Sequence, residues 1–182
     1  MVVSFTPELA EAHTAELVAL LMDAVDSGAS VGFMPPLAES EARTYWDRVI
    51  AAMREGTRVL LVALEGDLIQ GSVQIDLETR ANGNHRAEAM KLFVHRRARR
   101  RGLARSLMLE LESIARKLGR TLLVMDTRQG GKAEKICESL GYVRYGEVPG
   151  YARSGDGGYT PRFSSTDNWI RAPIRKVRRA AC

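Results

Sequence analysis

The sequence has few of the residues that build disulfide frameworks and metal centres. It contains two cysteines and three histidines in 182 residues. Cys137 lies in a stretch with a helical pattern, and Cys182 is the last residue of the sequence. A disulfide scaffold needs several paired cysteines, and a metal site needs closely spaced ligands, which no segment supplies. We therefore expect neither a structural disulfide nor a bound metal.

Long apolar runs are absent as well. No run approaches the roughly 18 residues that a membrane-spanning helix needs, and no charged and then apolar leader opens the sequence. This predicts a cytoplasmic protein with no membrane partner. Hydrophobic residues make up 45% of the chain and charged residues 27%, which is an ordinary globular composition.

Acidic residues are missing from the stretch 171–182. This stretch holds five basic residues, which account for the whole formal net charge of +5. Residues 1–170 are therefore neutral, and a nucleic-acid partner is not implied. Residues 173–182 carry charge without an apolar pattern, so we predict a disordered basic tail after one domain of residues 1–172.

Hydrophobic periodicity and turn residues predict an α/β fold (α+β, mixed sheet) in this domain. The expected helices cover residues 6–27, 39–55, 102–118 and 132–140. The expected strands cover residues 2–5, 58–64, 68–77, 89–94, 121–126, 142–147 and 165–172. Thr6 and Pro7 are typical of a helix start, and Gly119 is typical of a helix end. Gly155–Gly158 reads as a turn before the last strand.

A basic, glycine-containing turn separates an apolar strand from a strongly amphipathic helix. It reads Arg99-Arg100-Arg101-Gly102-Leu103-Ala104. Free N–H groups and the positive end of a helix dipole bind phosphate, and glycine allows close approach. The alternative is a solvated run of arginines or a nucleic-acid patch. However, nucleic-acid arms are usually terminal or spread along one helix face, whereas this run interrupts two core elements.

The pattern Arg-x-x-Gly-x-Ala resembles the acyl-CoA pyrophosphate loop of the GNAT N-acetyltransferase family, whose signature is Gln/Arg-x-x-Gly-x-Gly/Ala. The resemblance implies the GNAT fold, with the order β-α-α-β-β-β-α-β-α-β-β, and acetyl-CoA as co-substrate. Further segments between residues 17 and 156 resemble toxin-resistance acetyltransferases within this family. They are 28–34, 86–88, 91–92, 126–127, 133–134 and 146–151.

The same resemblance implies a set of residues that bind the co-substrate. The turn would hold the pyrophosphate, and the strand before it would run beside pantetheine with a backbone N–H on the thioester oxygen. These residues are Leu92, Phe93, Val94, Arg99, Arg100, Arg101, Gly102, Leu103, Ala104, Arg105 and Ser106.

Glu88 and Asp126 are the candidate general bases. Strand alternation predicts that Glu88 shares a pleat face with Met90, Leu92 and Val94, and Asp126 ends the next apolar strand. Parallel neighbouring strands would bring both carboxylates to one crevice, where open α/β sheets bind ligands. The alternative is an exposed residue at a strand start and a helix cap. Resemblance implies that the pair deprotonates the acceptor amine through water.

Cys137 stands where GNAT enzymes often carry a tyrosine that protonates the leaving thiolate. A thiol with a pKa of about 8.5 can donate a proton, although it is shorter than a tyrosine. Free cysteine is usually a small buried hydrophobe. We list Cys137 as a candidate acid and expect that it only packs.

These features predict an acetyl-CoA-dependent N-acetyltransferase that acts on the amine of a small molecule, such as an amino-acid-like toxin or antibiotic. Two alternatives remain open. In the first alternative, the acceptor is a protein lysine or N-terminus. In the second, the chain is a non-catalytic acyl-CoA-binding module. The sequence is compatible with a monomer or a homodimer.

Overall fold

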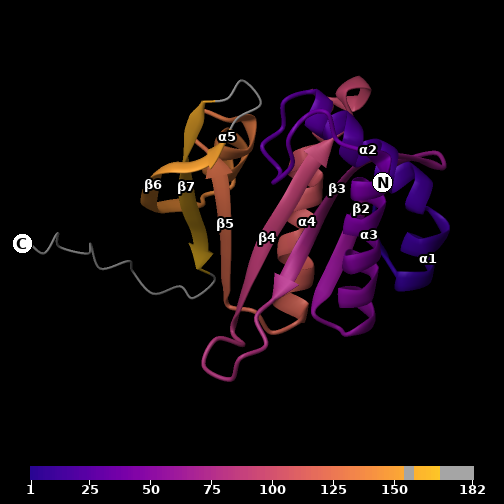
Figure 1. Cartoon of the computed structure of the whole chain (residues 1–182). Coiled ribbons are helices and arrows are strands. Elements are labelled where there is room, and N and C mark those ends of the chain that lie inside the picture. Colours follow the sequence, from indigo (N-terminus) through magenta and orange to yellow (C-terminus); the bar gives the residue numbers. More distant parts are fainter. Residues whose placement is uncertain (154–157, 169–182) are drawn as a thin grey trace, which may run out of the picture.

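In the computed structural model, which describes residues 1–153 and 158–168, seven strands form one mixed sheet in the order β1-β2-β3-β4-β5-β7-β6 (Figure 1). The strands are β1 (Val2–Phe5), β2 (Arg58–Glu65), β3 (Leu68–Leu77), β4 (Arg86–Val94), β5 (Leu122–Arg128), β6 (Val143–Arg153) and β7 (Tyr159–Asn168). Neighbouring strands are antiparallel except for β4 and β5. The parallel pair therefore lies in the interior of the sheet, with β5 reached through a helical crossover.

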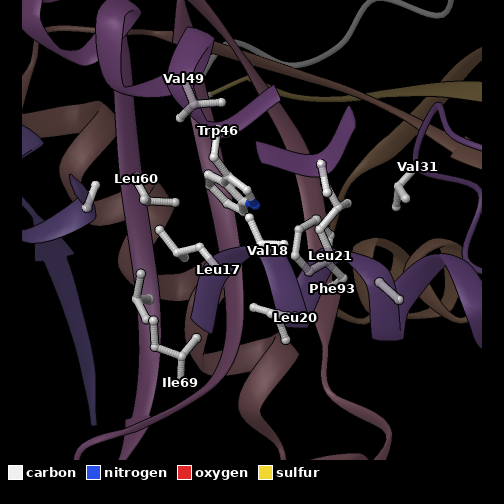
Figure 2. Packing of buried hydrophobic residues seen from close by; sticks show 14 of the residues in the cluster. Leu17, Val18, Leu20, Leu21, Val31, Trp46, Val49, Leu60, Ile69 and Phe93 are labelled. Atoms are coloured by element: carbon white, nitrogen blue, oxygen red, sulfur yellow. The ribbon is translucent and has the colours of Figure 1, made fainter. Parts of the chain in front are cut away.

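Helices cover the two faces of the sheet. On one face lie α1 (Pro7–Ala12), α2 (Thr14–Asp26) and α3 (Glu39–Arg54), and on the other lie α4 (Leu103–Lys117) and α5 (Lys132–Ser139). Each face has its own hydrophobic core. Trp46 of α3 is fully buried in the first core, with Leu17 and Leu60 beside it (Figure 2). No helix in the described part of the chain is long and apolar enough to cross a bilayer.

The predicted first helix is interrupted. Thr6 caps it as expected, since its Oγ1 accepts from the Leu9 N–H at 3.3 Å. A single helix to residue 27 is wrong, because the chain breaks at His13 (φ −104°, ψ 19°). The Thr14 hydroxyl donates to the carbonyls of Ala10 (3.1 Å) and Glu11 (2.8 Å). These carbonyls would otherwise serve the continuing helix, so the side chain competes with the backbone and favours a new start.

A β-bulge interrupts the alternation of β4. Ser72 pairs with Phe93 and Gln74 pairs with Met90, so two residues of β4, Lys91 and Leu92, face Val73 alone. Glu88 lies on the face opposite Ala87 and Ala89, whereas Leu92 and Val94 pack on the α4 side together with those alanines. The prediction that Glu88, Leu92 and Val94 share one pleat face is therefore wrong. The extra residue shifts the alternation by one position.

The C-terminal strands are longer than the sequence suggested. β6 continues to Arg153 instead of ending at residue 147, and β7 begins at Tyr159 instead of residue 165. β6 forms the edge of the sheet, and its register with β7 is irregular at two places. Most of the expected turn at 155–158 and the expected tail at 173–182 lie outside the described residues.

Candidate functional site

The predicted phosphate turn connects the end of β4 to the start of α4. After Val94 the chain passes through the short 3₁₀ helix η1 (Arg96–Ala98), and Arg100 and Gly102 then adopt positive φ values of 65° and 79°. Gly102 is the N-cap of α4 and makes no side-chain cap. The first helical bond of α4 runs from the Ser106 N–H to the Gly102 carbonyl (3.0 Å). The N–H groups of residues 103–105 therefore have no acceptor within the helix.

This turn has the features of an anion site. The three N–H groups lie at the positive end of the dipole of a 15-residue helix. A Cβ placed on Gly102 would have no atom within 4 Å, so open space adjoins the turn. Free donors, a favourable dipole and open space fit a pyrophosphate group, which is the part of acetyl-CoA that the sequence assigns to this turn.

Three arginine side chains of the turn brace it against neighbouring elements. Arg99 donates to the Val94 carbonyl through Nε (3.1 Å) and to the Ser27 hydroxyl through its guanidinium. Arg101 donates to the Glu65 carboxylate (3.1 Å), and Arg105 donates to Ser139 Oγ (3.1 Å). Arg101 and Arg105 are exposed as well, but the exposed Arg100 side chain, unlike them, makes no hydrogen bond or ion pair within the described residues. The backbone donors and Arg100 are thus the groups of the turn most accessible to an incoming anion.

β4 and β5 separate beyond Glu88. Their paired positions are Arg86–Leu122, Ala87–Leu123 and Glu88–Val124, after which the strands diverge (Figure 1). In the described part of the chain, the rest of β4, through Val94, therefore has no strand partner on the edge that faces β5. An extended, amide-containing chain such as pantetheine can pair with such an edge. The predicted contacts of Leu92, Phe93 and Val94 with the co-substrate are compatible with this opening.

Glu88 and Asp126 lie beside the point where the two strands part. Glu88 is level with Val124 on β5, and Asp126 follows two residues later on that strand. Burial raises the pKa of Glu88, and the nearby carboxylates of Asp126 and Asp76 raise this pKa further. Within the described residues, no hydrogen bond or ion pair joins the Glu88 carboxylate to a partner. A half-buried carboxylate of raised pKa binds a proton more readily than an exposed carboxylate does.

A pocket of about 370 Å³ opens next to Glu88. Its walls come from the ends of β3, β4 and β5 and from the turn before β2, and they include Asp76, Glu78, Arg86 and Thr57. The lining is mainly polar and carries both charges. Such a pocket suits a small polar acceptor rather than an apolar one.

The sequence profile of the Acetyltransferase (GNAT) family matches residues 22–142, which run from α2 to the end of α5. The chain belongs to this family. The predicted family, fold class and mixed sheet are thereby confirmed, apart from the split first helix. An uncharacterized N-acetyltransferase from the hisH-hisA intergenic region of Azospirillum brasilense is 34% identical over 109 residues. That match covers 59% of this chain and 63% of the relative, which is less than two thirds of its length.

Solved structures described as acetyltransferases share the fold. The ribosomal-protein-alanine N-acetyltransferase of Brucella melitensis superposes with a TM-score of 0.76 at 21% identity, covering 92% of this chain and 99% of that one. The yncA protein of Salmonella typhimurium, solved with its cofactor acetyl-CoA, gives a TM-score of 0.76 at 17% identity, with 98% of each chain covered. At these identities the likeness establishes the fold alone.

The candidate GNAT acid, Cys137, lies in a core. Its side chain is buried in the cluster between the sheet, α4 and α5, and its Sγ is 3.4 Å from Met125 Sδ. This environment is that of a packed hydrophobe. The role of Cys137 as a general acid therefore remains a prediction, and the buried surroundings of its side chain favour a packing role.

Sequence reasoning missed a polar network beside Glu88. Arg58 Nη2 pairs with Asp76 (2.9 Å), and Arg58 Nη1 donates to Gln74 Oε1 (3.0 Å). Gln74 is completely buried, and its Nε2 donates to the hydroxyl of Tyr45 (2.8 Å). Burial raises the pKa of Tyr45 to about 12, so this phenol stays protonated at neutral pH. The sequence does place a polar residue at every second position from Gln70 to Asp76, but a strand with one face toward solvent has the same pattern, so the pattern alone does not reveal a buried network.

Proposed function

We propose that this chain transfers the acetyl group of acetyl-CoA to the amine of a small polar molecule. The observation that supports this most is the Glu88 carboxylate, half-buried and without a hydrogen-bond partner in the described residues, beside the point where β4 and β5 part. An anion-binding turn lies at the far end of the same strand. A proton acceptor and a phosphate site joined by one strand suit a reaction between an amine and a CoA thioester.

Acetyl-CoA supplies the thioester, and the residues of the chain hold the reactants and move the proton. Glu88 accepts a proton from the acceptor ammonium through water, and the nearby carboxylate of Asp126 raises the affinity of Glu88 for that proton. The neutral amine nitrogen then forms a bond to the acetyl carbon and loses its second proton to water as the amide forms. The carbon–sulfur bond breaks, and the thiolate leaves with the electron pair of that bond and takes a proton from solvent, since Cys137 is buried in the core.

The acceptor class that we favour is an amino-acid-like toxin or antibiotic. Support comes from the segments that resemble the tabtoxin resistance acetyltransferase, among them 28–34, 86–88 and 146–151. The polar pocket beside Glu88, with charges of both signs, suits an acceptor that itself carries an ammonium and a carboxylate.

Release of free thiol from acetyl-CoA tests this proposal. The acceptor panel should contain amino acids and dipeptides with free amines, aminoglycosides, and peptides with a free N-terminus or lysine. Glu88→Gln and Asp126→Asn should each lower turnover by roughly 10²- to 10⁴-fold at unchanged acetyl-CoA affinity. Glu41→Gln, on the exposed surface of α3, is the matched control and should keep full activity.

The melting temperature separates a chemical defect from a folding defect. Because the fold raises the pKa of Glu88, it disfavours the charged form, so Glu88→Gln should not lower the melting temperature at neutral pH. Turnover with peptides alone would indicate a protein acetyltransferase. A thermal shift with acetyl-CoA but no turnover on any amine would indicate an acyl-CoA-binding module. Full turnover in both carboxylate variants would refute the proposed base.

A further inference from the structure

Lys91 occupies the bulge of β4 in an unusual backbone conformation. Its φ is 55°, in the left-handed region that a residue with a side chain rarely adopts. In a regular strand, the residue after Met90 would point toward α4. The bulge instead turns the Lys91 side chain to the opposite face, where α3 and the loop between α2 and α3 lie. Strained residues of this kind persist where the surrounding structure holds them, often at functional sites.

The contacts of the Lys91 ammonium include three groups from other elements. It donates a hydrogen bond to the carbonyl of Val31. It also lies over two aromatic rings, 5.6 Å from the centroid of Phe33 and 5.8 Å from that of Tyr45. The two rings meet edge to face at 5.2 Å. A cation over aromatic faces with a carbonyl acceptor forms a specific contact.

Two of these three groups belong to the loop at residues 27–38. The same loop contains Gly32, where an added Cβ would lie 2.9 Å from Lys91 Nζ. The loop backbone therefore comes so close to the ammonium that a side chain at this position would meet it. Val31 is itself buried in the core, so the contact joins a packed part of the loop to β4.

We propose that Lys91 is a positioning residue that fixes the loop at 27–38 over β4 and thereby shapes the acceptor side of the site. The inference rests on the proposed function, since it assumes that the acceptor amine reaches Glu88 from the face on which Lys91 and this loop lie. Lys91 lies three residues after Glu88, and its positive charge acts on the Glu88 carboxylate. One side chain thus ties the loop at 27–38 to the strand that carries the proposed base.

Lys91→Met tests the contact, because methionine keeps an unbranched chain of similar length but has neither charge nor donor. In the free protein, amide hydrogen exchange of residues 28–36 should become faster, while exchange in α4 and β5 stays the same. This readout requires no ligand and no activity. Lys91→Arg keeps the charge and should restore much of the protection, and Lys117→Met, at the exposed end of α4, is the matched control.

Steady-state kinetics then test the link to function. Lys91→Met should raise the KM of the acceptor by roughly ten- to hundredfold, with little change in the KM of acetyl-CoA. Phe33→Leu removes one ring from the loop and leaves the bulge intact, so it should shift both readouts in the same direction if Lys91→Met proves unstable. Unchanged exchange in residues 28–36 would overturn the contact, whatever the activity. Faster exchange with an equal rise in both KM values would overturn the acceptor-specific role.

Discussion

Glu88 and Asp76 face each other across β4 and β3, yet the fold treats the two carboxylates differently. Asp76 has the Arg58 guanidinium at 2.9 Å. Glu88 has no ion pair in the described residues, and burial with two neighbouring carboxylates raises its pKa. The positive charges of Arg58 and Lys91 partly offset this rise. Arg58 therefore limits how far the proton affinity of Glu88 increases.

Replacing Arg58 should move the pH dependence of catalysis. The base works as a carboxylate, so kcat/KM should rise with pH through the pKa of Glu88, above the ordinary glutamate range. In Arg58→Met this rise should move to higher pH, because one attractive charge is lost. Arg58→Lys keeps the charge and should stay near wild type. A pH profile of kcat/KM measures both, and identical profiles for Arg58→Met and wild type would exclude the electrostatic role.

Cys137 should contribute to stability rather than to turnover. Cys137→Ala removes one small group from the core that contains Met125, so we expect a loss of about 1 kcal/mol in the free energy of unfolding. Denaturant unfolding and steady-state turnover measure the two effects. Cys137→Ser preserves the size but buries a hydroxyl, so it should cost more stability than alanine. A tenfold loss of turnover in Cys137→Ala at unchanged stability would instead identify the thiol as the acid.

At the scale of elements, helix termini and the two neighbouring strands after α3 followed from local chemistry. Thr6 caps its helix, Gly119 (φ 72°) follows α4, and β2 and β3 pair at the positions of the expected strands 58–64 and 68–77. The bulge in β4 did not follow, because an apolar run such as 89–94 does not reveal where the alternation shifts. The sequence identified Glu88 and Asp126 as candidate bases, because both are acidic residues in predicted strands. Two of the groups that act on the pKa of Glu88, Arg58 of β2 and Asp76 of β3, are far from it in sequence, and only tertiary pairing identifies them.

Two substitutions at Gly102 distinguish the effect of backbone conformation in the turn from the effect of charge. Both Gly102→Asn and Gly102→Asp place a side chain in open space at positive φ, where Asn and Asp are the best tolerated substitutes. Only aspartate adds a negative charge at the helix N-terminus that we expect to bind pyrophosphate. Gly102→Asp should therefore abolish the thermal shift that acetyl-CoA produces, whereas Gly102→Asn should weaken it. Equal shifts in Gly102→Asp and wild type, measured by calorimetry, would remove the turn from the binding site.

At the scale of the whole molecule, one sheet contains two antiparallel halves that meet at a short seam. β1 to β4 form one half and β5, β7 and β6 the other, and three residue pairs join β4 to β5. α4 packs against the first half of the sheet, and α5 packs against β5. Residues of both halves and both helices belong to one hydrophobic core. A ligand seated between the diverging strands would contact both halves.

Acetyl-CoA should therefore slow hydrogen exchange in the segments that border the gap between the diverging strands. At a ligand concentration of about 100 Kd, stabilisation of the folded state amounts to about 2.7 kcal/mol. We expect slower exchange in residues 89–94, in β5 and in the first turn of α4, with smaller changes in α1. Gly102→Asp measured in the same buffer controls for nonspecific effects of the ligand. Protection that avoids residues 89–94 would show that the ligand lies elsewhere.

β6 exposes the edge of this sheet together with Tyr145 and Tyr151, both more than half exposed. Its two irregular places and Pro149 break the regular row of donors and acceptors that another strand would need. The distortion thus guards against aggregation, since apolar side chains on a regular edge would recruit further copies into an extended sheet. Pro149→Val would restore a donor and raise β-propensity. Its light scattering should therefore rise at lower protein concentration than that of wild type.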